Sequence, residues 1–172
     1  FTRRGLLKAL AGAGAATIAA PMLNRGRYRV FAGSPVEYSA RAVELMKRAT
    51  VIDMLGPLAL NSQKQAKWFA DPDSFRPADL QACRDSGINV FHIAVGMGGP
   101  EAYLNVLKFF ASWNGFIAHH SDHFMRIDSA TTLDRAKSSG KIGILLGLQN
   151  SDQFRNPADV DFFRGLGQRV SQ

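Results

Sequence analysis

Residues 141–151, with the sequence KIGILLGLQNS, constrain the fold of this chain more than any other segment. From Ile142 to Leu148 every residue is apolar or glycine, and no polar residue alternates with them. A run of this length and pattern is typical of a strand buried on both faces, as in a parallel sheet. Polar residues follow at 149–152, and α/β proteins place their chemistry at the carboxyl ends of parallel strands. We therefore expect a central strand here and look for function around Gln149.

Helical and strand patterns alternate along the rest of the chain. We expect strands at 50–53, 88–95, 142–148 and 168–171, whereas 125–128 is too short to predict as a core strand. We expect helices over 36–48, 77–86 (capped by Ser74), 100–119, 129–137 and 157–166, with 54–75 as a long loop that holds one helical turn near 64–69. This alternation predicts an α/β fold with four parallel strands and right-handed crossovers.

Two architectures fit this order. The first is the N-terminal half of a (β/α)8 TIM barrel, with residues 33–172 forming a partial barrel that is truncated at its C-terminus. The second is an open doubly wound parallel sheet. We favour the barrel because the chain ends within a predicted strand, so that more strands would follow.

Residues 1–32 are predicted to be an export signal. Residues 2–8 (TRRGLLK) fit the twin-arginine pattern, in which paired arginines precede two apolar residues and a lysine. The Ala- and Gly-rich run at 9–23 is too short to span about 30 Å of hydrocarbon as a helix. We expect recognition by the twin-arginine export machinery, cleavage near Ala32, a periplasmic or secreted location and no stable membrane span. The alternative is an amphipathic surface helix. Four glycines within residues 1–32 and the lack of a polar face argue against it.

The net charge of +7 raises the question of a polyanionic partner. Six of the basic residues lie within the first 29 residues, which contain no acidic residue, and from Val30 onward 15 basic residues face 14 acidic ones. Nucleic-acid binding needs a basic face on the folded domain. The charge distribution therefore argues against a nucleic-acid partner.

Two other segments have a chemical and a structural interpretation. Cys83 is the only cysteine, which excludes an internal disulfide. Its place three residues after Leu80 in a predicted helix favours a small buried side chain over a nucleophile.

The loop GMGGP at 96–100 joins a strand to a helix, where backbone amides can cradle a phosphate. It lacks the GxGxxG spacing and the lysine of a P-loop, so an ordinary turn is favoured.

Histidines near the end of the long predicted helix form a third candidate. His119 and His123 have the i, i+4 spacing that puts two imidazoles on one helix face, as for a metal. Histidines at a helix C-terminus also complement its dipole, and helix ends before a parallel strand lie opposite the catalytic face. The dipole role is favoured. His92 lies in a buried strand and is expected to be a hydrogen-bonded core residue.

Four segments together resemble the membrane (renal-type) dipeptidase family of metallopeptidases. They are TVIDMLGPL (50–58), LQACRDSGINVFHIAVG (80–96), SATTLDRAKSSGKIGILLGLQNS (129–151) and ADVDFFRGLGQRVSQ (158–172), and the resemblance covers about 49–172. It implies an amidohydrolase-like (β/α)8 barrel that cleaves dipeptides or related amides by a metal-activated water. In that family strand one ends in D-G-H-N-D, whose His and second Asp bind zinc, and strand three ends in G-x-E-G, whose Glu bridges two metals.

This chain departs from the family pattern at the expected zinc ligands. Leu55 stands at the position of the ligand His, Pro57 at that of the ligand Asp, and Gln149 at that of the bridging Glu. Leu and Pro offer no donor atom, and a neutral Gln gives one weak oxygen in place of a bridging carboxylate. The resemblance places two further histidines beyond Gln172. We therefore expect at most one zinc per chain, held with Gln149 or Asp53.

Two functions follow, and both take a small peptide-like molecule. The first is a dipeptidase-like metallohydrolase, with Asp53 as a catalytic residue, Gln149 as a metal ligand, and Asn150 and Ser151 as substrate-binding residues. The second is a metal-poor barrel that serves as a binding protein, or that uses Asp53 for proton transfer in another periplasmic reaction. The metal content of the full-length protein separates the two.

Overall fold

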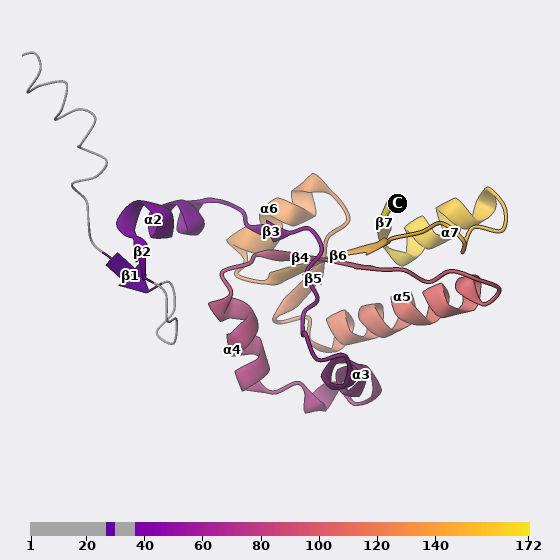
Figure 1. Ribbon diagram of the computed structural model, residues 1–172, viewed down its shortest axis with the longest axis horizontal. Coiled ribbons are helices and arrows are strands. Elements are labelled where there is room, and N and C mark those ends of the chain that lie inside the picture. Colours follow the sequence, from indigo (N-terminus) through magenta and orange to yellow (C-terminus); the bar gives the residue numbers. More distant parts are fainter. Residues whose placement is uncertain (1–26, 30–36) are drawn as a thin grey trace, which may run out of the picture. The chain divides into compact units, whose positions relative to one another are not determined.

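The computed structural model describes residues 27–29 and 37–172. The chain divides into two compact units, Phe1–Ala49 and Thr50–Gln172. In the first unit, β1 (Arg27–Arg29) pairs antiparallel with β2 (Glu37–Ser39), and α2 (Ala40–Arg48) follows (Figure 1). Apart from β1, the predicted export signal lies outside the described residues, and its boundary at residue 32 stays a prediction. No helix in the described ranges is long and apolar enough to cross a membrane.

The helix expected from residue 36 begins only at Ala40. Ser39 is its N-cap, because the Ser39 hydroxyl accepts a hydrogen bond from the Ala42 amide at 3.2 Å. The three residues before the helix are extended and pair with β1. The apolar spacing that predicted the helix was correct, and the serine that ends the extended segment sets its start.

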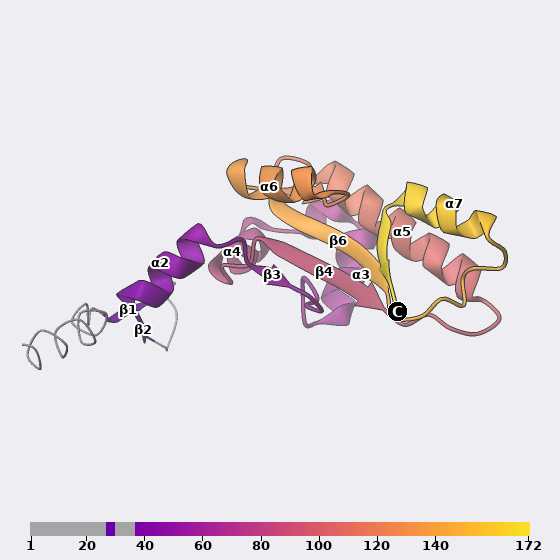
Figure 2. The same cartoon turned by 90° about the horizontal axis from the view of Figure 1, so that it is seen from above.

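The second unit is a parallel α/β sheet. Its elements in chain order are β3 (Ile52–Asp53), α3 (Ser62–Ala70), the 3-10 helix η1 (Pro72–Ser74), α4 (Pro77–Asp85), β4 (Val90–Val95), α5 (Ala102–His119), β5 (Phe124–Arg126), α6 (Ala130–Ser138), β6 (Ile142–Leu148), α7 (Ala158–Leu166) and β7 (Gln168–Ser171). Figure 2 shows the two long strands, β4 and β6, running side by side through the unit. The predicted alternation of helix and strand is confirmed.

The central strand is β6, as its sequence predicts. Along one side, Val90–Val95 of β4 pairs with residues 143–148 of β6. Along the other side, β5 pairs with the first half of β6 and β7 pairs with the second half. The sheet therefore has one parallel strand more than the four expected, because the segment 125–128 was too short to predict as a core strand. Three residues suffice because β5 needs to fill only the half of the edge that β7 leaves open.

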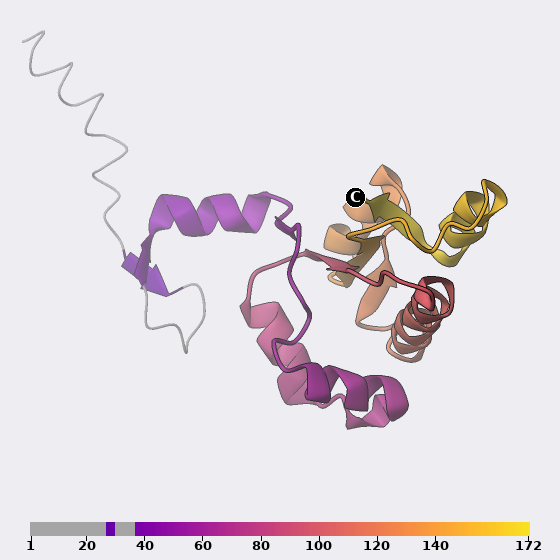
Figure 3. The same ribbon diagram turned by 45° about the vertical axis from the view of Figure 1, so that its right-hand side comes forward.

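The strand order explains which face each helix covers. The chain crosses the sheet in one direction from β3 to β4, from β4 to β5 and from β6 to β7, but it moves back from β5 to β6. Right-handed crossovers then place α6 on the face opposite the other helices of the unit. Figures 1 and 3 show α6 on one side of the sheet and α4 and α5 on the other.

Two apolar clusters confirm this division of the faces. The main core lies between the sheet and α3, α4, α5 and α7, and we call this side the outer face; its largest fully buried side chains include Trp113, Phe110, Phe116, Phe124 and Phe163. On the other side, the inner face, Leu133 and Ala136 of α6 pack against Val90 and Leu145. These inner-face residues lie in the first halves of β4 and β6, so α6 covers the N-terminal half of the inner face.

The segment 54–75 contains more structure than the predicted loop. The nine-residue helix α3 begins after Asn61, whose side-chain oxygen accepts from the Lys64 amide at 3.0 Å. Trp68 of α3 is 3% exposed, and its ring packs edge to face against Phe75. Ser74 does not cap α4 as expected; it lies in η1, and the Asp79 carboxylate accepts from the Arg76 amide at 2.9 Å instead.

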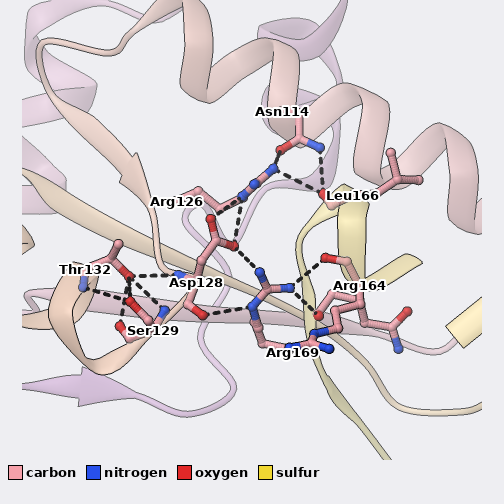
Figure 4. Close-up of polar contacts among 9 residues, drawn as sticks. Asn114, Arg126, Asp128, Ser129, Thr132, Arg164, Leu166 and Arg169 are labelled. Atoms are coloured by element: carbon pink, nitrogen blue, oxygen red, sulfur yellow. Dashed lines mark hydrogen bonds and ion pairs between the residues drawn. The ribbon is translucent and has the colours of Figure 1, made fainter. Parts of the chain in front are cut away.

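A polar network holds the junction between β5 and β7 (Figure 4). The Nε of Arg126 lies 3.0 Å from both oxygens of Asp128, and its Nη1 donates to Asn114 of α5 at 2.9 Å. Arg169 of β7 reaches the same carboxylate at 2.9 Å through Nη2. One carboxylate thus joins the end of β5 to the beginning of β7, so that the two short strands together complete the edge of β6.

Candidate active site

Two segments meet where β4 and β6 end beside each other. Val95 and Leu148 are register partners, and the Gln149 amide donates to the Val95 carbonyl at 3.0 Å. The segment after β4 is the glycine loop 96–100, and the segment after β6 is the polar run 149–152. The fold therefore brings the predicted polar tip to the carboxyl end of the sheet, next to the glycine loop.

Side chains of the polar run hold the glycine loop in place. The Asn150 side-chain oxygen accepts from the Met97 amide at 2.9 Å, and the Asp152 carboxylate accepts from the Gly99 amide at 3.1 Å. A Cβ at Gly98 would lie 2.8 Å from the same Asp152 carboxylate, so a residue with a side chain would displace it. These bonds agree with the ordinary turn that the sequence favours, because the chain's own carboxylate already binds a loop amide.

Ser151 lies next to the end of β7. Its hydroxyl is 3.0 Å from that of Ser171, which in turn donates to the Asn150 carbonyl at 3.3 Å. Gln149 is exposed, and its side-chain oxygen is 3.7 Å from the position of a Cβ on Gly96. The structure thus gathers Gln149, Asn150 and Ser151 at the ends of β4, β6 and β7.

Asp53 lies in a separate place. It is half-buried at the end of β3, and its carboxylate accepts from the Leu55 amide at 3.1 Å. A Cβ on Gly56 would overlap this carboxylate, so the turn needs glycine there. Asp53 pairs in register with Phe91, which pairs with Ile144, five residues before Gln149. At about 3.3 Å per residue, Asp53 and Gln149 are separated by roughly 16 Å along the strands.

The described residues do not fit a two-metal centre. Leu55 is 58% exposed and apolar, Pro57 is exposed, and both lack a donor side chain. Across residues 27–29 and 37–172, no group of three His, Cys, Asp or Glu side chains is placed to hold a metal ion. Gln149, Asn150 and Ser151 carry neutral amides and a hydroxyl, which are weak ligands for zinc. The one carboxylate of the polar run, that of Asp152, accepts from the Gly99 amide. We therefore derive no chemical step through a metal at these residues.

The histidines at the end of α5 take part in packing contacts. His119 Nε2 lies 2.9 Å from the Asp73 carboxylate, and His120 Nε2 lies 3.1 Å from the Pro72 carbonyl, so both contact η1. Burial lowers the pKa of His120, although its contact with the Pro72 carbonyl acts in the opposite direction. The partner Asp73 could not be found from the histidine spacing, because it lies 46 residues away.

Cys83 is buried, as its place in the predicted helix indicates. Burial raises the pKa of its thiol to about 11, and the nearby Asp79 carboxylate adds to the effect. Cys83 lines a cavity of about 490 Å³ between the segment 57–61, α3 and α4, together with the paired Lys64 and Asp79. This cavity holds none of the polar residues at the ends of β4 and β6, so we do not assign the site to it.

His92 is a buried titratable residue of β4, the strand that ends at the glycine loop. It is 3% exposed, and its Nδ1 lies 2.6 Å from the Met54 carbonyl, just after Asp53. The expected role as a hydrogen-bonded core residue is confirmed for this nitrogen. The other ring nitrogen, Nε2, is buried without a hydrogen-bond partner among the described residues.

Comparison with solved structures identifies the architecture. An amidohydrolase from Pseudomonas aeruginosa matches with a TM-score of 0.55 and 23% sequence identity, over 75% of this chain and 35% of that chain. The chain has the fold of part of an amidohydrolase barrel. The dipeptidase AC, a metallopeptidase of family M19, matches with a TM-score of 0.54 and 12% identity, over 72% of this chain and 42% of that chain. The partial barrel is therefore confirmed over the open doubly wound sheet.

The chain spans about 35% to 42% of the length of these two solved proteins. No protein-family profile matches the chain, and no curated protein sequence matches it either. At these identities the likeness shows the fold, and fold alone does not determine function. Function must therefore be inferred from the residues at the strand ends.

Proposed function

We propose that the protein is a dipeptidase-like hydrolase that acts on dipeptides or related small amides. The observation that carries the proposal is the joint position of Gln149, Asn150 and Ser151 at the carboxyl ends of three parallel strands. Barrel enzymes place their chemistry at this edge. The fold is shared with an amidohydrolase and with a dipeptidase, which supports the same class of substrate.

In this proposal the polar tip binds the substrate. The exposed Gln149 amide can accept from a peptide N–H and donate to a carbonyl or carboxylate, and the Ser151 hydroxyl can do the same. An extended dipeptide is about 7 Å long, which is shorter than the roughly 16 Å that separates Asp53 from Gln149 along the strands. One dipeptide therefore does not contact both residues, and the catalytic role of Asp53 stays a prediction.

A specific observation favours a second candidate, a metal-poor barrel that binds a peptide-like molecule without hydrolysing it. The positions expected to hold zinc carry Leu55, Pro57 and Gln149, and the described part of the chain offers no cluster of metal-binding side chains. A hydrolase that lacks a metal-activated water loses a strong nucleophile at neutral pH. Slow turnover, or none, is the expected consequence.

Dipeptide hydrolysis by the intact protein tests the proposal. We expect slow release of amino acids from a panel of dipeptides, and a rate lowered about fivefold by Gln149→Ala, because one charge-neutral substrate contact is worth about 1 kcal/mol. Gln63→Ala removes an exposed amide from α3 and should leave the rate unchanged. Binding measured by calorimetry without turnover would favour the second candidate, and neither binding nor turnover would contradict both.

We also propose export by the twin-arginine route, which the sequence of residues 2–8 supports. Replacing Arg3 and Arg4 by Lys should leave the protein in the cytoplasm, because the pathway reads the paired arginines. Cell fractionation followed by immunoblotting measures this. Unchanged accumulation in the periplasm would exclude this signal.

A further inference from the structure

We propose that His92 is a positioning residue that fixes the start of the segment 54–57, at Met54, against the inner face of the sheet, and that Gly147 provides the space its imidazole needs. The role bears on catalysis only through the proposed function, because it orders the segment that follows Asp53. The contacts themselves are independent of any activity. They come from a strand, a loop and a glycine that are far apart in the sequence.

The first contact shows which ring nitrogen of His92 carries a proton. Its Nδ1 lies 2.6 Å from the Met54 carbonyl, 38 residues away. A carbonyl oxygen can only accept a hydrogen bond, so Nδ1 must carry the proton. The same hydrogen bond ties the chain after β3 to the middle of β4.

The second contact explains the glycine at position 147. His92 pairs in register with Leu145, and its ring extends diagonally toward Gly147 on the same face of β6. A Cβ on Gly147 would overlap His92 Nε2 and would lie 2.9 Å from the Val170 Cβ of β7. Any side chain at position 147 would therefore push the imidazole away from the Met54 carbonyl.

The second ring nitrogen, Nε2, forms no hydrogen bond that would hold the ring. This atom is buried and has no hydrogen-bond partner among the described side chains and backbone groups. A buried polar atom without a partner costs free energy. The ring keeps its place through the Nδ1 bond to Met54 and the fit against Gly147, so the ordering of the segment depends on these two contacts.

Histidine NMR on the intact protein tests the assigned form. The chain has four histidines, and the resonance lost in His92→Asn identifies His92. We expect the nitrogen chemical shifts to show a proton on Nδ1. An unprotonated Nδ1, with the proton on Nε2, would overturn the proposal.

Hydrogen exchange tests the positioning role. His92→Leu removes the donor, whereas the Asn side chain of His92→Asn can still donate from the position of Nδ1. We expect His92→Leu and Gly147→Ala each to speed amide exchange at least about tenfold in the segment after β3, at Leu55, Gly56 and Leu58. We expect His92→Asn to speed exchange of the same amides less than about threefold. Amides of α5 should not change. Gly165→Ala is the glycine control, because a Cβ there meets nothing within 4 Å.

Equal acceleration of amide exchange in α5 would show that His92 is only a core residue. Unchanged exchange in segment 54–57 after both His92→Leu and Gly147→Ala would show that the segment does not depend on His92. Either result overturns the proposal. Hydrolysis is not one of the readouts. Inactivity of the intact protein would therefore contradict the proposed function and leave the result for His92 unaffected.

Discussion

Gly167 makes the turn from α7 into β7, and two observations fix its identity. Its φ of 110° lies in the left-handed region, and a Cβ on it would lie 2.8 Å from the Arg126 Cδ. We predict that Gly167→Ala lowers the free energy of unfolding by about 1–3 kcal/mol, because it adds backbone strain and displaces the arginine. Urea denaturation of the intact protein measures this.

The control for that change lies two residues earlier. Gly165 is inside α7, and a Cβ there meets nothing within 4 Å. Gly165→Ala should leave stability unchanged or raise it by up to about 1 kcal/mol, since alanine favours the helix. Equal losses of unfolding free energy in the two variants would mean that neither the positive φ of Gly167 nor its contact with Arg126 accounts for the effect.

The pair formed by Arg155 and Asp159 makes stability depend on pH. Asp159 accepts from the Arg155 guanidinium at 3.0 and 3.1 Å and from the Arg155 amide at 2.9 Å. The guanidinium, followed by the amide, holds the pKa of Asp159 below its ordinary value. The stabilisation is therefore present above the unfolded pKa, near 3.9, and is lost as pH falls through the lower folded value.

We predict that Asp159→Asn flattens the acid limb of the stability profile below about pH 4. The free energy of unfolding, measured from pH 6 to pH 2, checks this. Asp161→Asn, an exposed change in the same first turn of α7, serves as the control for the helix dipole. A profile for Asp159→Asn that is parallel to the wild type would contradict the assignment.

At the scale of elements, the cap of α6 holds the helix that covers the inner face. The Ser129 hydroxyl accepts from the Thr132 amide at 3.2 Å, and the Thr132 hydroxyl accepts from the Ser129 amide at 2.9 Å. We predict that Ser129→Ala lowers the free energy of unfolding by about 1 kcal/mol. Ser138→Ala, at the exposed end of the same helix, should change it little. Thermal denaturation compares the two, and similar losses would argue against the cap.

Local patterns predicted most of these elements. The long apolar run of β6 has few alternatives to a buried strand, and Ser129 and Gly167 mark where a helix starts and another ends. β5 could not be predicted in the same way, because its pairing depends on β7 taking only half of the same edge. The helix α3 was underestimated, since its buried Trp68 packs against Phe75 and Phe116, which come later in the chain.

The candidate site was predicted only in part. The sequence placed function at Gln149 because a polar run follows a buried strand, and the structure brings this run to the glycine loop. The bonds from Asn150 to Met97 and from Asp152 to Gly99 each join residues 53 positions apart, so no local pattern contains them. Asp53 and Gln149 each end or follow a predicted strand, but the register, which the sequence does not reveal, offsets them by five residues along the sheet.

At the scale of the whole molecule, a partial barrel fold is combined with strand ends that carry poor metal ligands. The described part of the chain has the fold of part of an amidohydrolase barrel. Leu55, Pro57 and Gln149 stand where the resemblance to the dipeptidase family predicts His, Asp and Glu. Imidazole and carboxylate groups supply the affinity for zinc. Replacing three such groups should remove a two-zinc centre rather than weaken it slightly.

The zinc content of the intact protein, measured by elemental analysis after dialysis, tests this account most directly. We predict no more than one zinc per chain, because the described residues provide no cluster of metal ligands. The combined change Leu55→His, Pro57→Asp and Gln149→Glu should raise the zinc content, since it returns imidazole and carboxylate donors to the strand ends. Two tightly bound zinc ions in the unaltered protein would contradict the account.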